Sequence, residues 1–221
     1  MSILFYRGNC GMIGEQSLIR TIGVIGSIAG IAAGLASLLR PFATSALSVA
    51  AYTTEVGLWI LWLVLQGSAF LFIYRERNDT AALAAFILAI ISALIEALVL
   101  IVLFTVPSII DLAESLVTIL QFVFTILIGT FTEATYLIFS GIAVLHMTRF
   151  GAKESIAFGT GILFILTGCV VGLGFFVTLP LFIPIFVIVL NIIACILFIS
   201  PMPTDSQQYG TEETDSGIEI L

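Results

Sequence analysis

The chain consists mostly of long apolar runs separated by short polar breaks, and this pattern restricts what it can fold into. The runs cover residues 21–39, 50–74, 80–105, 116–147, 156–177 and 182–200. Since a helix rises about 1.5 Å per residue, roughly 20 apolar residues cross the hydrocarbon core of a bilayer. The chain is 60% hydrophobic and only 10% charged, which is far from the composition of a soluble domain. The sequence therefore predicts an all-α, polytopic membrane bundle with six transmembrane helices.

The breaks between the runs carry charges and prolines. Arg40-Pro41 closes the first run, because proline cannot continue a helix, and a charge cluster at residues 75–79 separates the second run from the third. The fourth run, residues 116–147, would be about 48 Å long as a helix, which is long for one span and short for two. We expect one tilted helix. The alternative splits this run at Gly129-Thr130 and gives seven spans.

The placement of the basic residues predicts the orientation of the bundle. With six spans and a cytosolic N-terminus, only Arg40 lies on the outer side. The cytosolic side then holds Arg7, Arg20, Arg75, Arg77, Arg149 and Lys153. Cytosolic loops of membrane proteins are enriched in Lys and Arg. We therefore expect both termini in the cytosol and the protein in the plasma membrane.

Two terminal segments flank the predicted bundle of residues 21–200. Residues 1–20 form a cytosolic N-terminal segment. Residues 201–221 have five acidic residues, no basic residue and little apolar content, which predicts a disordered acidic tail. The net charge of −7 and the lack of clustered Lys and Arg exclude a nucleic-acid-binding surface.

Three of the apolar runs carry polar and small residues at steps of three or four, which places each set on one helix face. In lipid these faces must turn toward other helices, since hydrocarbon cannot satisfy polar groups. We call these faces together the polar seam. The second run contributes Tyr52, Glu55, Trp59, Trp62 and Gln66; the third Ala82, Ala85, Ala89, Ser92 and Glu96; the fourth Thr118, Gln121, Thr125, Gly129, Thr132, Glu133, Tyr136 and Ser140.

Two carboxylates of the polar seam are expected at matching depth. Glu96 lies about 24 Å and Glu133 about 21 Å from the cytosolic ends of their helices, with Glu55 somewhat higher at about 28 Å. No Lys or Arg is expected at that depth, so the carboxylates should not all be ionised. A shared proton, a bound cation or a water-filled cavity would resolve the conflict.

The sequence thus favours a transporter or channel-like protein that passes or binds a cation or proton along the polar seam. The predicted pathway residues are Glu96, Glu133, Glu55, Gln66, Gln121 and Tyr136. The alternative is a non-catalytic subunit or assembly protein, in which protonated glutamates only fix helix packing. Glu55 has a further alternative, a place at the outer interface.

Glycines at four-residue spacing form a second feature. Gly26, Gly30 and Gly34 mark the first run, and Gly168 and Gly172 mark the fifth. Such rows let helices approach closely, so we predict a packing role. The alternative is a docking face for a second copy of the chain or for another membrane protein.

The residues that most enzymes and cofactor sites need are sparse. His146 is the single histidine and is expected at the cytosolic interface, and the three cysteines have no metal-ligand spacing. The runs contain no lysine, and the chain has no phosphate-binding loop. We therefore expect no cofactor and no metal site, and an enzyme has no support from the residues.

Overall fold

The computed structural model of the protein describes residues 10–42, 48–105, 128–148, 154–174 and 182–200. Within these five segments the chain forms six α-helices and one short 3-10 helix, η1, and no strands. The elements are α1 (Cys10–Leu39), η1 (Arg40–Phe42), α2 (Ser48–Arg77), α3 (Thr80–Thr105), α5 (Thr130–Thr148), α6 (Glu154–Gly174) and α7 (Phe182–Ile199).

Five of the described helices are long and apolar enough to cross a membrane. The qualifying segments are Ser17–Phe42, Ala50–Arg77, Thr80–Ile101, Ser155–Leu173 and Phe182–Ile199. Their outward faces expose large apolar side chains, such as Ile28, Leu94 and Phe158, each more than half exposed. A continuous apolar surface is unfavourable in water and suits contact with lipid. The chain is a multi-pass integral membrane protein.

Helix α5 is the described part of the predicted fourth run, and it is not one of these five. It begins at Thr130, directly after a π-turn at residues 128–129, and includes Glu133 and His146. Residues 116–127 of the predicted run lie outside the described residues. The sixth span and the orientation of both termini therefore stay predictions.

The helices are longer than the predicted spans at several ends. Helix α1 begins at Cys10 rather than at residue 21, and α2 continues to Arg77 rather than ending at residue 74. The apolar runs mark where a helix can contact hydrocarbon, whereas a helix can continue into polar surroundings without any change in its backbone hydrogen bonding. The hydropathy pattern therefore underestimated the length of these two helices.

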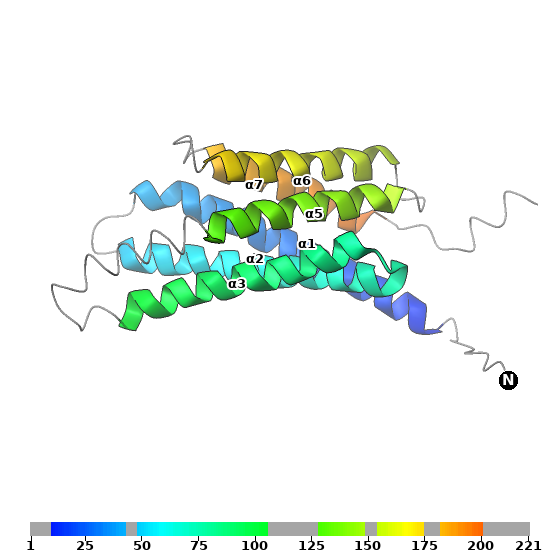
Figure 1. Ribbon diagram of the computed structural model, residues 1–221, viewed down its shortest axis with the longest axis horizontal. Coiled ribbons are helices and arrows are strands. Elements are labelled where there is room, and N and C mark those ends of the chain that lie inside the picture. Colours follow the sequence, from blue (N-terminus) through cyan, green and yellow to red (C-terminus); the bar gives the residue numbers. More distant parts are fainter. Residues whose placement is uncertain (1–9, 43–47, 106–127, 149–153, 175–181, 201–221) are drawn as a thin grey trace, which may run out of the picture.

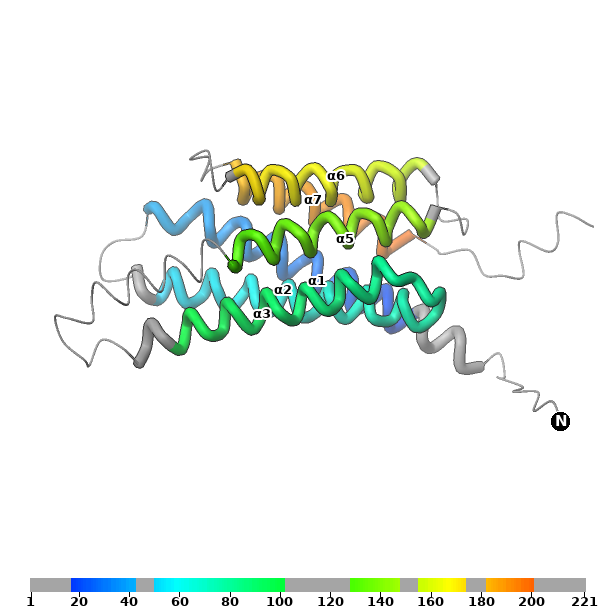
Figure 2. The backbone as a smooth tube through the Cα atoms, viewed as in Figure 1, coloured from blue at the N-terminus to red at the C-terminus, as the bar shows by residue number. Residues whose placement is uncertain are grey.

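The six helices form a closed ring in which each has extensive contacts with two neighbours. Going round the ring, α1 contacts α2, α2 contacts α3, α3 contacts α5, α5 contacts α6, α6 contacts α7, and α7 returns to α1 (Figure 1). All six lie along the long axis of the molecule, as the backbone tube makes clear (Figure 2). The ring encloses the side chains that hydrocarbon could not accommodate.

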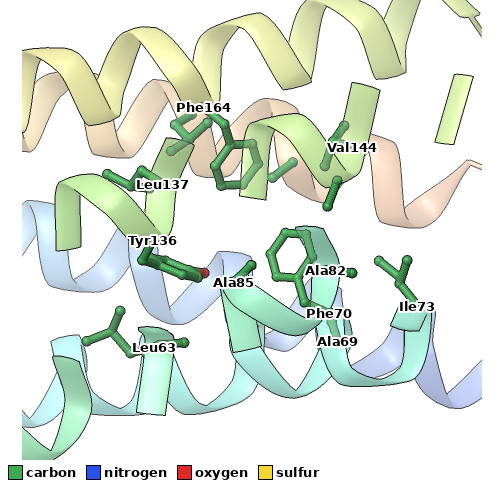
Figure 3. Packing of buried hydrophobic residues seen from close by; sticks show 14 of the residues in the cluster. Leu63, Ala69, Phe70, Ile73, Ala82, Ala85, Tyr136, Leu137, Val144 and Phe164 are labelled. Carbon is green, nitrogen blue, oxygen red and sulfur yellow. The ribbon is translucent and has the colours of Figure 1, made fainter. Parts of the chain in front are cut away.

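Aromatic rings fill the centre of this ring of helices. Trp62 of α2 contacts Tyr136 of α5 edge to face, with ring centroids 5.8 Å apart. Phe70 of α2 contacts Tyr136 and also Phe164 of α6, each at 6.4 Å (Figure 3). Edge-to-face pairs place the positive rim of one ring on the negative face of the next. This row of aromatic rings links α2, α5 and α6 across the bundle.

The glycine rows contact neighbouring helices of the same chain. Gly26 lies against the backbone of α2 at Gln66, and Gly30 lies against the side chain of Asn191 of α7. On the other side of the ring, Gly168 lies against the carbonyl of Ala134 of α5. At these three positions a side chain would collide with backbone or with a buried amide, so these glycines allow the helices to approach closely.

The turn between α2 and α3 is joined to the end of α5. Asn78 adopts a left-handed conformation with φ of 52° and donates its N–H to the carbonyl of Tyr74, which ends α2. Asp79 accepts the N–H of Ala81 at 2.8 Å and so caps the start of α3. Its second oxygen lies 3.0 Å from Nδ1 of His146. His146, expected only at the interface, therefore also connects two parts of the ring.

We predict opposite effects for two glycine-to-alanine substitutions. A methyl group at Gly30 would overlap the Asn191 carboxamide, whereas one at Gly57 would meet no atom within 4 Å. Gly30→Ala should therefore destabilise the protein by about 1–3 kcal/mol through overpacking. Gly57→Ala should leave the stability unchanged or raise it by up to about 1 kcal/mol, because alanine favours helix.

The melting temperatures of both variants are measured in the same detergent, with size-exclusion chromatography to monitor the loss of folded protein on heating. Equal melting temperatures for the two would contradict the described contact between α1 and α7.

Candidate functional site

A cavity lies among α2, α3, α5 and η1, at the end of the bundle opposite the turn between α2 and α3. Its volume is about 160 Å³. We call it the acidic cavity. The lining residues are Arg40, Tyr52, Glu55, Val56, Trp59, Leu63, Ser92, Glu96, Gly129 and Glu133.

Three glutamates from three different helices line the acidic cavity. Glu55 comes from α2, Glu96 from α3 and Glu133 from the first turn of α5. These helices are successive members of the ring, so their inward faces converge on one space (Figure 1). The depth argument from the sequence paired Glu96 with Glu133; the cavity also includes Glu55.

Of the three glutamates that line the acidic cavity, Glu55 has the most polar contacts. It is 7% exposed, and its Oε1 accepts a hydrogen bond of 2.5 Å from the Ser37 hydroxyl. Its Oε2 lies 3.3 Å from Nη1 of Arg40. The Ser37 oxygen in turn accepts the indole N–H of Trp59 at 3.3 Å. Glu55 is thus buried within the bundle, and a place at the outer interface stays an open alternative.

Arg40 supplies Glu55 with a basic partner that the sequence analysis did not predict. It belongs to η1, and its guanidinium lies 5.6 Å from the centre of the Tyr52 ring. The short link between α1 and α2 returns the chain antiparallel, so the end of one helix lies beside the start of the next. The sequence could have indicated the Arg40–Glu55 pair, because Arg40 ends the first run and Glu55 lies near the start of the second.

Glu96 and Glu133 differ from Glu55 in their surroundings. Within the described part of the chain, no basic side chain and no hydrogen-bond donor contacts either carboxylate. Ser92, one turn before Glu96 on α3, is 2% exposed, and its hydroxyl has no partner among the described residues. Counting only the residues that the structure describes, the acidic cavity thus combines two carboxylates without a basic partner and one hydroxyl without a hydrogen-bond partner.

Gln66 and Tyr136, both predicted pathway residues, do not line the acidic cavity. They are fully buried, and the Tyr136 hydroxyl donates to Oε1 of Gln66 at 3.1 Å. Beyond this pair, toward the turn between α2 and α3, the interior contains the apolar side chains of Phe70, Ile73 and Val144 (Figure 3) and also the buried Ser140. Gln121, the remaining predicted residue, lies outside the described residues.

Asn191 is a buried polar residue that the sequence analysis missed. Its Oδ1 accepts the indole N–H of Trp62 at 2.9 Å, and its Nδ2 donates to the carbonyl of Val187 at 2.9 Å. The signal was available, since Asn191 is the one amide in a run of otherwise apolar residues at 182–199. Its role is to join α2 to α7 across the ring.

Comparison with protein-family models, with curated proteins and with solved structures found no match for this chain. The features of the chain itself therefore define its class of protein. It is a multi-pass helical membrane protein with an acidic cavity inside its ring of helices.

We predict that the Gln66–Tyr136 hydrogen bond stabilises the bundle. Tyr136→Phe leaves the Gln66 carbonyl without its donor and should cost about 1 kcal/mol, the usual size of such a bond between membrane helices. Adding Gln66→Met removes the second polar group and should restore most of the lost stability, because no buried acceptor is then left unpaired.

The comparison variant is Tyr74→Phe, a partly buried tyrosine near the end of α2, for which we expect a change within about 0.5 kcal/mol. Melting temperatures in detergent measure all four proteins. A double variant less stable than Tyr136→Phe alone would show that the two side chains do not act as a pair.

Proposed function

We propose that the protein is a transporter that binds a cation or a proton in the acidic cavity. The observation that carries this proposal is the charge balance of the cavity: three carboxylates and one guanidinium line it, and among the described carboxylates the guanidinium contacts only Glu55. Two ionised carboxylates without partners would be costly in a membrane interior. A proton or a bound cation removes that cost, so the cavity has a built-in affinity for positive charge.

The apolar interior beyond the cavity supports a transporter over an open channel. Phe70 and Ile73 of α2 and Val144 of α5 are at most 2% exposed and belong to the same buried cluster. These side chains pack together between the acidic cavity and the turn between α2 and α3. A transporter exposes its site to one side at a time, so a site closed at one end fits that mechanism.

The alternative, a non-catalytic subunit or assembly protein, keeps one specific observation in its favour. The Gln66–Tyr136 and Trp62–Asn191 hydrogen bonds fix the packing of α2 against α5 and α7. The glycine rows, however, contact helices of the same chain, which removes them as a ready docking face. The acidic cavity itself has no role in this alternative.

The proposed setting is a plasma membrane crossed six times, with both termini in the cytosol. Arg75 and Arg77 lie in the last turn of α2 at one end of the bundle, and Arg40 lies at the opposite end with the acidic cavity. The positive-inside rule then directs the end with Arg75 to the cytosol. The acidic cavity would face the outside, and the segments 1–20 and 201–221 would be cytosolic.

We predict that Glu96→Gln and Glu133→Gln each abolish ion movement while leaving the fold intact. Glutamine preserves the shape and most of the hydrogen bonding of glutamate but cannot ionise. The measurement is flux of protons, Na⁺ and K⁺ into liposomes containing the purified protein, with melting temperature as the check on folding.

The control for these variants is Glu76→Gln at the opposite end of α2, which should retain the flux of the unmodified protein. If the Gln variants at positions 96 and 133 fold and transport normally, the acidic cavity is not the pathway. Absence of any flux from the unmodified protein would favour the subunit alternative.

The topology proposal gives a separate prediction. In a protein without its three native cysteines, single cysteines introduced at Ser108 and Ser206 should react with an impermeant maleimide from opposite sides of sealed vesicles. Six spans separate these positions by an odd number of crossings, whereas seven spans place them on the same side. Labelling of both from one side would therefore replace the six-span topology by the seven-span one.

A further inference from the structure

We infer that the cation bound in the acidic cavity is a small organic cation of the guanidinium type, and that it enters by displacing Arg40 from Glu55. This inference rests on the proposed function, because it names the chemical class of the bound cation. It assigns Arg40 a role of its own, as a tethered competitor for the site.

The size of the acidic cavity is the first argument. Its volume of about 160 Å³ far exceeds that of a dehydrated metal ion. Cavities of about 150 Å³ hold a molecule as large as benzene, and one water molecule occupies roughly 30 Å³. The acidic cavity therefore has room for a small organic ion.

The arrangement of the carboxylates is the second argument. Among the described residues, no three Asp, Glu, His or Cys side chains converge closely enough to hold a metal ion. A hard cation such as Ca²⁺ needs six or more oxygen atoms within about 2.6 Å. Glu55, Glu96 and Glu133 instead lie around the wall of a larger space, which suits a ligand that can contact each of them at a different atom.

The rest of the wall offers contacts that an organic cation can use. Tyr52 and Trp59 provide aromatic surface, and Val56 and Leu63 provide aliphatic surface. Aromatic faces attract guanidinium and ammonium groups, and they do so more strongly where water is excluded. Aliphatic surface would contact a short alkyl substituent on the ligand. A metal ion gains little from either kind of wall.

Ser92 supplies an independent indication that a ligand belongs in this cavity. Its hydroxyl is buried and has no partner among the described residues. A buried hydroxyl without a partner costs free energy, and its oxygen can accept two hydrogen bonds. A guanidinium has five or more N–H donors in one plane, so a single ligand could reach Ser92 together with Glu96 and Glu133.

Arg40 shows that one corner of the cavity already holds a guanidinium. Its Nη1 lies 3.3 Å from Glu55, and its guanidinium carbon lies 5.6 Å from the centre of the Tyr52 ring. The side chain is half exposed and belongs to a three-residue 3-10 helix at the rim, so it can leave without unfolding a longer element. A free guanidinium compound would meet the same carboxylate and the same ring once Arg40 moves aside.

The experiment measures binding of radiolabelled methylguanidinium to the purified full-length protein, by scintillation proximity at constant ionic strength set with NaCl. We expect saturable binding that Glu55→Gln and Glu96→Gln each weaken at least tenfold. Ser92→Ala should weaken it at least threefold, and this variant removes only a hydroxyl group. Arg40→Ala should tighten binding at least threefold, because the competing cation is gone.

Two control variants lie at the opposite end of α2: Arg75→Ala and Glu76→Gln should bind like the unmodified protein, and melting temperatures show whether each variant folds.

If methylguanidinium does not bind while the Glu96-dependent flux of H⁺, Na⁺ or K⁺ is present, this inference is overturned and the proposed function stands. Binding that is unchanged in Glu55→Gln and Glu96→Gln also overturns it, because the ligand then lies elsewhere. Weaker binding in Arg40→Ala would contradict competition by Arg40, and absence of both binding and flux would overturn the proposed function as well.

Discussion

Hydrocarbon offers no hydrogen-bond partner, so each polar side chain on a membrane helix must find one inside the protein or reach an aqueous boundary. The closed ring of six helices meets this requirement by enclosing the polar faces. Trp62 donates to Asn191, and Tyr136 donates to Gln66, in both cases between helices that are far apart in the sequence. Each bond removes a polar group from lipid and at the same time fixes the rotation of two helices about their axes.

Close approach of the helices depends on small residues, because lipid contributes no hydrophobic force that pushes apolar helices together. Ala82, Ala85 and Ala89 give α3 a buried face without protruding side chains, and Gly67 of α2 lies against Ala89. Dispersion contacts and interhelical hydrogen bonds then act over short distances. Trp62, Tyr136, Phe70 and Phe164 lie at the centre of the ring of helices, where each meets another aromatic ring edge to face (Figure 3).

The acidic cavity departs from this rule of internal satisfaction, and the proposed function rests on that departure. Glu55 is satisfied by Ser37 and Arg40, whereas Glu96, Glu133 and Ser92 have no such partners among the described residues. Polar groups left unsatisfied in a membrane protein reduce its stability. Gln66 Nε2 and Ser140 Oγ are also buried without a partner, but only Ser92 of these residues lines the acidic cavity.

The sequence alone predicts the class of fold and which face of each helix points into the bundle. Apolar runs of sufficient length require spanning helices, and spacings of three and four residues placed Glu55, Glu96, Glu133, Gln66 and Tyr136 on inward faces. These conclusions follow from local geometry, which repeats along every helix.

The contacts of the inward residues follow only from the tertiary structure, because they depend on which helices are neighbours in the ring. It divided the polar seam into an acidic cavity and a separate Gln66–Tyr136 pair, paired Asn191 with Trp62, and brought Arg40 to Glu55 through the short link between α1 and α2. No periodicity in the sequence contains that information, since the contacts join residues up to 129 positions apart.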